Sequence, residues 1–337
     1  KEAVNVVGLN APAKAHFAAM LCKEFGRQGI FITDSDYTAK KIAEDFLFYF
    51  PDEAYFYPSK ELEFFKADAK SHELQNKRLE IIEKLAGGAK NSVTVMSIDA
   101  ALQFTVDIAA YRESALLVTV GDELLVTEIS KKLTNMGYTR EDMVEGKGQF
   151  SVRGGIIDVF PPSAENPFRI ELFGDEVDSI RTFDVFTQVS VENIEHAKIG
   201  PADESFRSKN ADTCVLEYFE DDAFVFFDEP QAISERVEGL NWDIEETVKA
   251  LAEKDKHFQF QEKYIHNYYD VLHELLKHPF VGLLELPRST QDYHPKAEVH
   301  INAGEIGKAP TERDKFYEEL NEWLKTYTVV FSVDKDR

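Results

Sequence analysis

A glycine and a lysine near the start of the chain have the spacing of a phosphate-binding site. Gly8 follows an apolar stretch and Lys14 comes six positions later, as the first glycine and the lysine do in the P-loop pattern G-x-x-x-x-G-K-[ST]. In that loop the glycines let backbone amides close around phosphate, the lysine neutralises charge, and the hydroxyl binds Mg²⁺. The spacing alone therefore suggests a nucleotide site.

Three of the groups that such a site needs are missing. Ala13 stands where the second glycine would allow close backbone approach, and Pro12 lacks an amide hydrogen. Ala15 replaces the hydroxyl that would bind the metal. We therefore predict that this site does not hydrolyse nucleotide. Lys14 also has an alternative interpretation, as an exposed residue in the first turns of a helix.

A second fragment supports the interpretation of a degenerate ATPase site. Asp228 and Glu229 end the apolar run VFFDEP, where a Walker B strand carries a metal-binding acid and a water-positioning acid. A helicase-type D-E-x-H sequence would have histidine in place of Gln231. Two acids capping a strand are the alternative, but together with residues 6–15 this fragment favours a decayed ATPase fold.

The composition points to a folded protein with protein partners. The hydrophobic fraction is 43%, and 337 residues are enough for two or three domains. The formal charge of −24 opposes DNA binding, because such binding depends on Lys and Arg. No membrane span or signal peptide is evident, so we expect a cytoplasmic protein.

Other kinds of site are not supported by spacing. His294 and His300 do not have metal-ligand spacing, and we interpret Cys22 and Cys214 as reduced core residues. The chain begins with Lys1 and ends just past an apolar run, so we expect it to be a module of a longer polypeptide.

Alternating strand and helix patterns in the first hundred residues predict a parallel sheet covered by helices. The expected strands are 4–9, 29–35, 54–59 and 92–98, with helices from Pro12 towards Gly29 and from Asp36 to Phe50. After Pro201 this style returns, with expected strands at 213–219 and 223–230, a helical stretch at 230–278, and a last helix that starts with a capping box of Thr311 and Asp314 before a final strand.

Between these halves, short strands separated by turns predict a small inserted domain. After a helix near 122–136 the strands GQFSV, IIDVF, FRIELF and VDSIRTF follow one another too closely for crossover helices, so we expect an antiparallel sheet. The predicted domains are 1–114, 115–200 and 201–337. The fold class is α/β, a parallel sheet interrupted by an α+β insert.

Strand alternation in the insert nominates an interaction surface. In FRIELF, alternation buries Phe168, Ile170 and Leu172 and turns Arg169, Glu171 and Phe173 outward. In the preceding GQFSV strand, Ser151 and Arg153 are expected to point outward as well. Arginine beside an exposed aromatic is typical of interface hot spots. The alternative is that Phe173 folds into the hairpin end beside Gly174.

Residues 146–188 closely resemble the second domain shared by the excision-repair protein UvrB and the bacterial transcription-repair coupling factors (Mfd). The motif R-G-x-x-[IL]-D-[IVL]-[FY]-P, followed by R-[IVL]-[ED]-x-F-x-[DE]-E, carries the resemblance. UvrB has an intact P-loop, so Ala13, Ala15 and Gln231 favour the coupling factors. The sequence P-A-D-E at 201–204 is also similar to that family.

The resemblance implies an adaptor without catalysis. It implies domains 1a, 2 and 1b of UvrB in a RecA/helicase-like fold with a degenerate P-loop, and recruitment of UvrA by imitation of UvrB. Arg153, Arg169 and Phe173 carry over as UvrA-binding positions, and we add Glu171 and Asp175. No cofactor is expected here. ATP, magnesium, DNA and RNA polymerase would be bound by other parts of the parent protein, a superfamily 2 motor.

Two other functions stay open at this point. An ATP-dependent, UvrB-like DNA-damage or helicase subunit would have to tolerate the altered loop, and would bind ATP through Lys14. Alternatively, the α/β part would serve to cover and restrain the motor of the parent protein.

Overall fold

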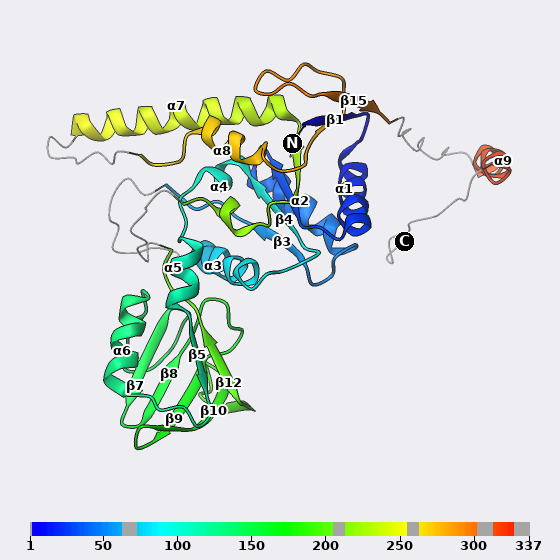
Figure 1. Ribbon diagram of the computed structural model, residues 1–337. Coiled ribbons are helices and arrows are strands. Elements are labelled where there is room, and N and C mark those ends of the chain that lie inside the picture. The colour runs from blue at the N-terminus through cyan, green and yellow to red at the C-terminus, as the bar shows by residue number, and fades with distance from the viewer. Residues whose placement is uncertain (1, 63–72, 205–212, 255–262, 302–312, 327–337) are drawn as a thin grey trace. The chain divides into compact units, whose positions relative to one another are not determined.

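The computed structural model describes residues 2–62, 73–204, 213–254, 263–301 and 313–326 (Figure 1). The chain consists of two compact units, Lys1–Ile301 and Asn302–Arg337. In the second unit the described residues include helix α9 (Arg313–Trp323). Thr311 of the expected capping box and the expected final strand lie outside the described residues.

Strands from both ends of the first unit form one parallel sheet. Its order is β15-β1-β14-β13-β2-β4-β3, and every neighbouring pair is parallel. The strands are β1 (Val4–Val7), β2 (Gly29–Thr33), β3 (Ala54–Tyr57), β4 (Val93–Ser97), β13 (Phe224–Asp228), β14 (Phe280–Leu284) and β15 (Ala297–His300). Because β13 lies between β14 and β2, the halves before and after the insert share one sheet, which confirms the predicted fold class.

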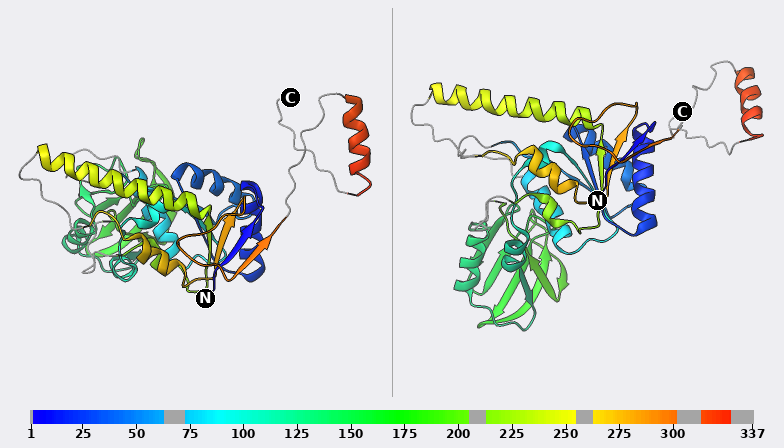
Figure 2. Two further views of the ribbon diagram at one scale, coloured as in Figure 1. Left: turned by 90° about the horizontal axis from the view of Figure 1, so that it is seen from above. Right: turned by 45° about the horizontal axis from the view of Figure 1, so that its top comes forward.

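Helices cover both faces of this sheet. The strands are rich in buried β-branched and aromatic residues, and a parallel sheet of this kind must be covered on both faces. Helices α1 (Ala11–Phe25) and α2 (Asp36–Leu47) pack against Phe31, Val95 and Phe226 on one face. The other face is covered by α3 (Glu73–Ala86), α4 (Ile98–Leu102), α7 (Pro230–Lys254) and α8 (Tyr268–Leu275). Figure 2 shows this arrangement from two further directions.

The insert has its own sheet and core. Six strands lie in the order β11-β10-β9-β8-β7-β6, and every neighbouring pair is antiparallel except β6 with β7. They are β6 (Thr139–Arg140), β7 (Gln149–Arg153), β8 (Ile156–Val159), β9 (Phe168–Phe173), β10 (Glu176–Phe183) and β11 (Ser190–Ile194). Helix α6 (Val126–Asn135) and the antiparallel pair β5 (Leu116–Thr119) and β12 (His196–Ile199) complete the domain. The expected antiparallel α+β insert is confirmed, whereas the three domain boundaries stay predictions.

The expected strand at 213–219 is wrong. Residues Val215–Tyr218 form a short 3₁₀ helix, η1, and Val215, Leu216 and Tyr218 are buried in the core beneath the sheet. A short apolar run fits a strand and a buried connector equally well, so periodicity could not separate them. The helical stretch at 230–278 contains two helices, α7 and α8, and residues 255–262 between them lie outside the described residues.

A buried ion pair joins the exit of the insert to the α/β part. Arg78 on α3 donates from Nε to Glu204 Oε1 at 2.6 Å and from Nη2 to Oε2 at 3.1 Å. Neither side chain is more than 1% exposed. Lys60 Nζ donates to Glu204 at 2.9 Å, and the Arg78 guanidinium lies 4.3 Å from the centre of the Tyr57 ring.

This network keeps Glu204 charged. Burial alone would raise the pKa of the Glu204 carboxyl, but the positive charges of Arg78 and Lys60 outweigh burial and lower it. The fold of residues 201–204 therefore depends on charges contributed by a helix more than a hundred residues away.

Candidate functional site

The turn between β1 and α1 is short. Helix α1 begins at Ala11, so only residues 8–10 separate it from β1. The Asn10 side chain caps the helix and accepts a hydrogen bond from the Ala13 amide at 3.1 Å. The amide that a phosphate would use is thus already bonded within the chain.

Gly8 has a packing role in this turn. Its φ of +98° is one that other residues rarely adopt. A Cβ atom at this position would lie 2.1 Å from the carbonyl oxygen of Ile301, which follows β15. The close approach of the backbone at Ile301 therefore requires glycine at this position. The presence of Gly8 does not depend on a phosphate.

Lys14 is buried and bound to both acids of the Walker B fragment. Its Nζ atom lies 2.6 Å from Asp228 Oδ1 and 2.6 Å from Glu229 Oε1, and the residue is 3% exposed. The alternative of an exposed helical lysine is therefore wrong. Glu229 Oε1 also accepts a hydrogen bond from the Glu285 amide at 2.7 Å, and Glu229 has a φ of +46°.

The charges in this cluster do not favour a polyphosphate. Burial would lower the pKa of the Lys14 ammonium, but the carboxylates of Asp228 and Glu229 outweigh it and raise the pKa. Lys14 therefore stays charged, and it is outnumbered by the two carboxylates around it. A bound triphosphate would have to compete with both acids for the single ammonium group.

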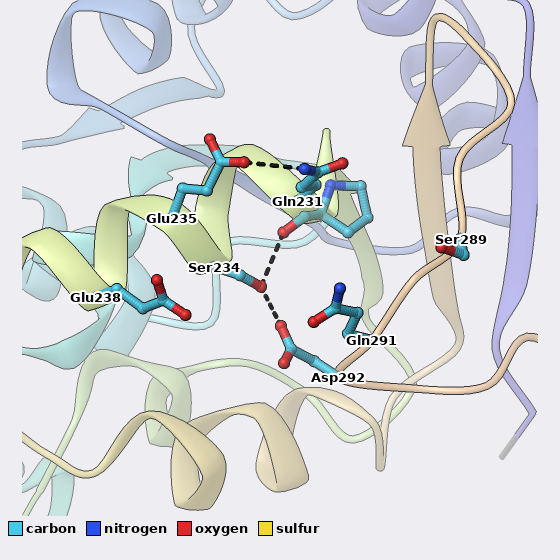
Figure 3. Close-up of a pocket in the computed structure, with 8 residues that line it drawn as sticks. Gln231, Ser234, Glu235, Glu238, Ser289, Gln291 and Asp292 are labelled. Atoms are coloured by element: carbon cyan, nitrogen blue, oxygen red, sulfur yellow. Dashed lines mark hydrogen bonds between the residues drawn. The ribbon is translucent and has the colours of Figure 1, made fainter.

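A small pocket beside the first turns of α7 is acidic as well. Its volume is about 220 Å³. Gln231 donates to Glu235 at 2.9 Å, and the Ser234 hydroxyl, which has one hydrogen to donate, lies within reach of two acceptors, the Asp292 carboxylate and the Pro230 carbonyl (Figure 3). Gln231, at the position where a helicase would have histidine, is thus hydrogen-bonded to an acid of its own helix. The acids Glu235, Glu238 and Asp292 line the pocket, and their charge is unfavourable for phosphate.

On the insert, two arginines converge on one buried carboxylate. Arg169 donates from Nε to Asp158 Oδ1 at 2.7 Å and from Nη2 to Oδ2 at 2.9 Å, and Arg153 donates from Nη2 to Oδ2 at 2.6 Å. The exposed fractions of the side chains are 47% for Arg153, 15% for Arg169 and 0% for Asp158. The two predicted arginines therefore lie side by side.

The remaining predicted residues of this surface differ in their exposure and in their contacts with other residues. Phe173 is 84% exposed at the end of β9, so the hairpin-end alternative is wrong. Glu171 is half-buried and binds Arg181 and, at 3.2 Å, Ser179. Asp175 is exposed in the turn after β9, where its carbonyl oxygen accepts from the Leu124 amide at 2.6 Å.

Ser151 corrects the expected pattern of this face. It was expected to point into solvent, but it is 1% exposed, opposite Asp158 in the β7–β8 pair. The face is not fully wet, because Phe183 and Phe160 form a small second core on it, with Val144 and Val185. The Arg169 guanidinium stacks 4.3 Å from the centre of the Phe183 ring.

Sequence reasoning missed Asp158, Gln188 and Phe183 at this surface. Asp158 could have been found, because Ile157 and Val159 point into the core and alternation then places Asp158 on the arginine side of β8. Gln188 Oε1 accepts from Arg169 at 3.3 Å across a loop, and no periodic pattern marks such a contact.

Within the described ranges, no group of three or more His, Cys, Asp or Glu side chains has the arrangement of a metal site. Cys22 and Cys214 are both buried and unbridged, as expected. No helix of the described part is long and apolar enough to cross a bilayer.

Comparison with known proteins identifies the insert and most of the chain. Residues 116–205 match the family described as the UvrB interaction domain. The "Transcription-repair-coupling factor" of Bacillus subtilis (strain 168) is 36% identical over 200 residues, which are 59% of this chain and 17% of that protein. That of Staphylococcus aureus (strain bovine RF122 / ET3-1) is 30% identical over 295 residues, 87% of this chain and 24% of that protein. The matched part of the chain is thus at most a quarter of the length of these relatives.

Proposed function

This chain is related to the transcription-repair-coupling factors and contains a UvrB interaction domain, and we propose that it is a non-catalytic adaptor that binds UvrA. The observation that carries the proposal is the surface of the insert on which Arg153 and Arg169 lie together and Phe173 is 84% exposed. A role in nucleotide excision repair coupled to transcription follows, and it would place the chain in the cytoplasm.

The chemistry of the surface fits a protein partner. Arginine and a large exposed aromatic are the residue types that dominate interface energies. Residues 115–200 hold eight Lys and Arg against fifteen Asp and Glu, so the domain as a whole repels nucleic acid. A local basic and aromatic patch on an acidic domain suits a partner whose own patch is acidic and apolar.

Contacts within the α/β part also support the proposal. The Asn10 cap, the bonds from Lys14 to both Walker B acids and the acidic pocket beside α7 all oppose ATP binding. We therefore assign no cofactor to this chain. ATP-driven movement, DNA and RNA polymerase would belong to other parts of the parent protein.

Replacing Arg169 or Phe173 with alanine should weaken UvrA binding by about 2 kcal/mol each, or roughly 30-fold. Calorimetric titration of UvrA with the 337-residue chain measures this. Phe48→Ala is the matched control, because Phe48 is also 84% exposed but belongs to the α/β part, just after α2. The control should bind as the unchanged chain does.

The same titration has two adverse outcomes. An unchanged chain that does not bind UvrA would contradict the adaptor function. Full binding by the Arg169→Ala, Phe173→Ala double variant would retain the function but remove this surface from it.

Magnesium ATP at millimolar concentration should leave the thermal midpoint of the chain unchanged. A ligand present at 1,000 times its dissociation constant would stabilise the fold by about 4 kcal/mol, so micromolar binding would be obvious. Differential scanning calorimetry with and without nucleotide is sufficient. A rise that disappears in Lys14→Ala would instead support the ATP-dependent, UvrB-like subunit.

A further inference from the structure

Asp158 lies at the centre of the surface formed by Arg153, Arg169 and Phe173. It lies on β8, directly opposite Arg169 on β9 and Ser151 on β7. Its neighbours Ile157 and Val159 point into the core of the insert, so alternation directs the Asp158 carboxylate to the other face. A fully buried acid in the middle of a sheet needs partners, because an unpaired buried charge is strongly unfavourable.

The two arginines supply these partners and are oriented by them. Both carboxylate oxygens of Asp158 are used, with Oδ1 accepting from Arg169 and Oδ2 accepting from both arginines. Such charge-assisted bonds fix the plane of a guanidinium group. Arg153 uses one nitrogen in this contact, and its side chain is 47% exposed and so accessible to a partner.

A loop between β10 and β11 holds Arg169 from the other side. Gln188 accepts from Arg169 Nη2 at 3.3 Å, and its amide nitrogen donates to the carbonyls of Val144 at 3.3 Å and Val185 at 2.8 Å. Gln188 has a φ of +59°, which is uncommon for a residue other than glycine. The uncommon backbone conformation thus occurs at Gln188, the residue that joins the loop to Arg169.

The charge of the cluster indicates what it receives. Two guanidinium groups and one carboxylate leave a single positive charge in excess, and the neighbouring Arg181 and Glu171 neutralise each other. Phe173 adds an exposed apolar group on the same side of β9 as Arg169. The surface therefore complements a carboxylate that lies beside an apolar recess.

We propose that Asp158 and Gln188 are positioning residues of the UvrA-binding surface, and that they hold Arg153 and Arg169 to receive a carboxylate of the partner. The proposal rests on the proposed function. Neither residue needs to touch the partner, since each acts through an arginine.

The variant Asp158→Asn separates positioning from charge. It removes the negative charge and keeps the size, so the cluster becomes more positive. If the cluster acted only by its net charge, an acidic partner would bind this variant at least as tightly. Positioning predicts the opposite, because the arginines lose their common anchor, and we expect UvrA binding to weaken about tenfold or more in calorimetric titration.

A double-mutant cycle provides a readout that general destabilisation would not change. When Arg153 and Arg169 are already alanine, Asp158→Asn should have almost no further effect on UvrA affinity, so the effects are strongly coupled. Additive effects would overturn the proposal. Binding by Asp158→Asn that equals or exceeds that of the unchanged chain would overturn it too.

Two further variants keep the test decisive if Asp158→Asn folds poorly. Gln188→Asn shortens the side chain while tolerating the positive φ, and should weaken binding severalfold through Arg169, whereas full binding by it would remove Gln188 from the proposal. Asp99→Asn is the matched control, because Asp99 binds Arg236 in the α/β part and should not affect UvrA. Circular dichroism confirms the fold of each variant.

Absence of UvrA binding by the unchanged chain would instead contradict the proposed function itself.

Discussion

Arg78→Ala is expected to lower the free energy of unfolding by about 3–5 kcal/mol, because it leaves the Glu204 carboxylate buried with one partner removed. Arg78 and Glu204 are almost completely buried, and Arg78 also bonds the Pro58 carbonyl at 2.9 Å and Gln103 at 3.1 Å. Denaturation with urea, followed by circular dichroism, measures the change. We expect the contact between the insert and the α/β part to fail together with the fold of residues 201–204.

A surface pair is the control for this prediction. Lys249 and Glu246 form an ion pair of similar length, 2.9 Å, on the exposed side of α7. Lys249→Ala should leave stability almost unchanged, because exposed pairs contribute little. Equal losses in Arg78→Ala and Lys249→Ala would show that burial of the first pair does not matter.

The ion pair of Arg78 and Glu204 also predicts that the stability of the fold depends on pH. The pKa of Glu204 is lowered in the folded state, so its contribution is fully present above the ordinary value of about 4.5. It is lost as the pH falls from there through the lowered folded value. In Glu204→Gln this part of the acid sensitivity should disappear, as urea titrations at pH 3, 4 and 6 would show.

Lys14→Met should also destabilise the chain by about 3 kcal/mol or more. It leaves Asp228 buried beside Glu229, with no cation between two carboxylates. Burial already raises the pKa of the Asp228 carboxyl against the opposing effect of Lys14, and without the lysine it should rise further, so the loss should be greatest at neutral pH and smaller in mild acid. Thermal and urea unfolding at pH 5 and pH 7 measure this.

Two variants make the Lys14 result specific. Lys41→Met removes an exposed lysine of α2 and should change stability by less than about 0.5 kcal/mol. Adding Asp228→Asn to Lys14→Met should recover part of the loss, because one of the uncompensated charges is then gone. No loss in Lys14→Met would mean that the lysine is kept for a ligand, which would favour the ATP-dependent alternative.

The strand and helix patterns were informative where periodicity was strong. The strands of the first hundred residues, the helix after Asn10 and the hairpins of the insert lie where alternation and turn residues predict them. The strands at 280–284 and 297–300 were not predicted, although Pro279 and Pro295 stand just before them. Both pair with β1, which is almost three hundred residues earlier, and β14 also pairs with β13.

By itself, the sequence determined that this chain is an α/β protein with an antiparallel insert, that residues 8–15 depart from the P-loop pattern at Ala13 and Ala15, and that Arg169 and Phe173 share one side of a strand. Local properties decide these features, since side-chain alternation and the chemistry of a single residue do not depend on distant partners. Only the tertiary structure decided that Lys14 is bound by Asp228 and Glu229 and that Arg78 anchors Glu204. Buried charges require partners, and the fold brought those partners together from other strands, helices and loops, at separations that no local pattern records.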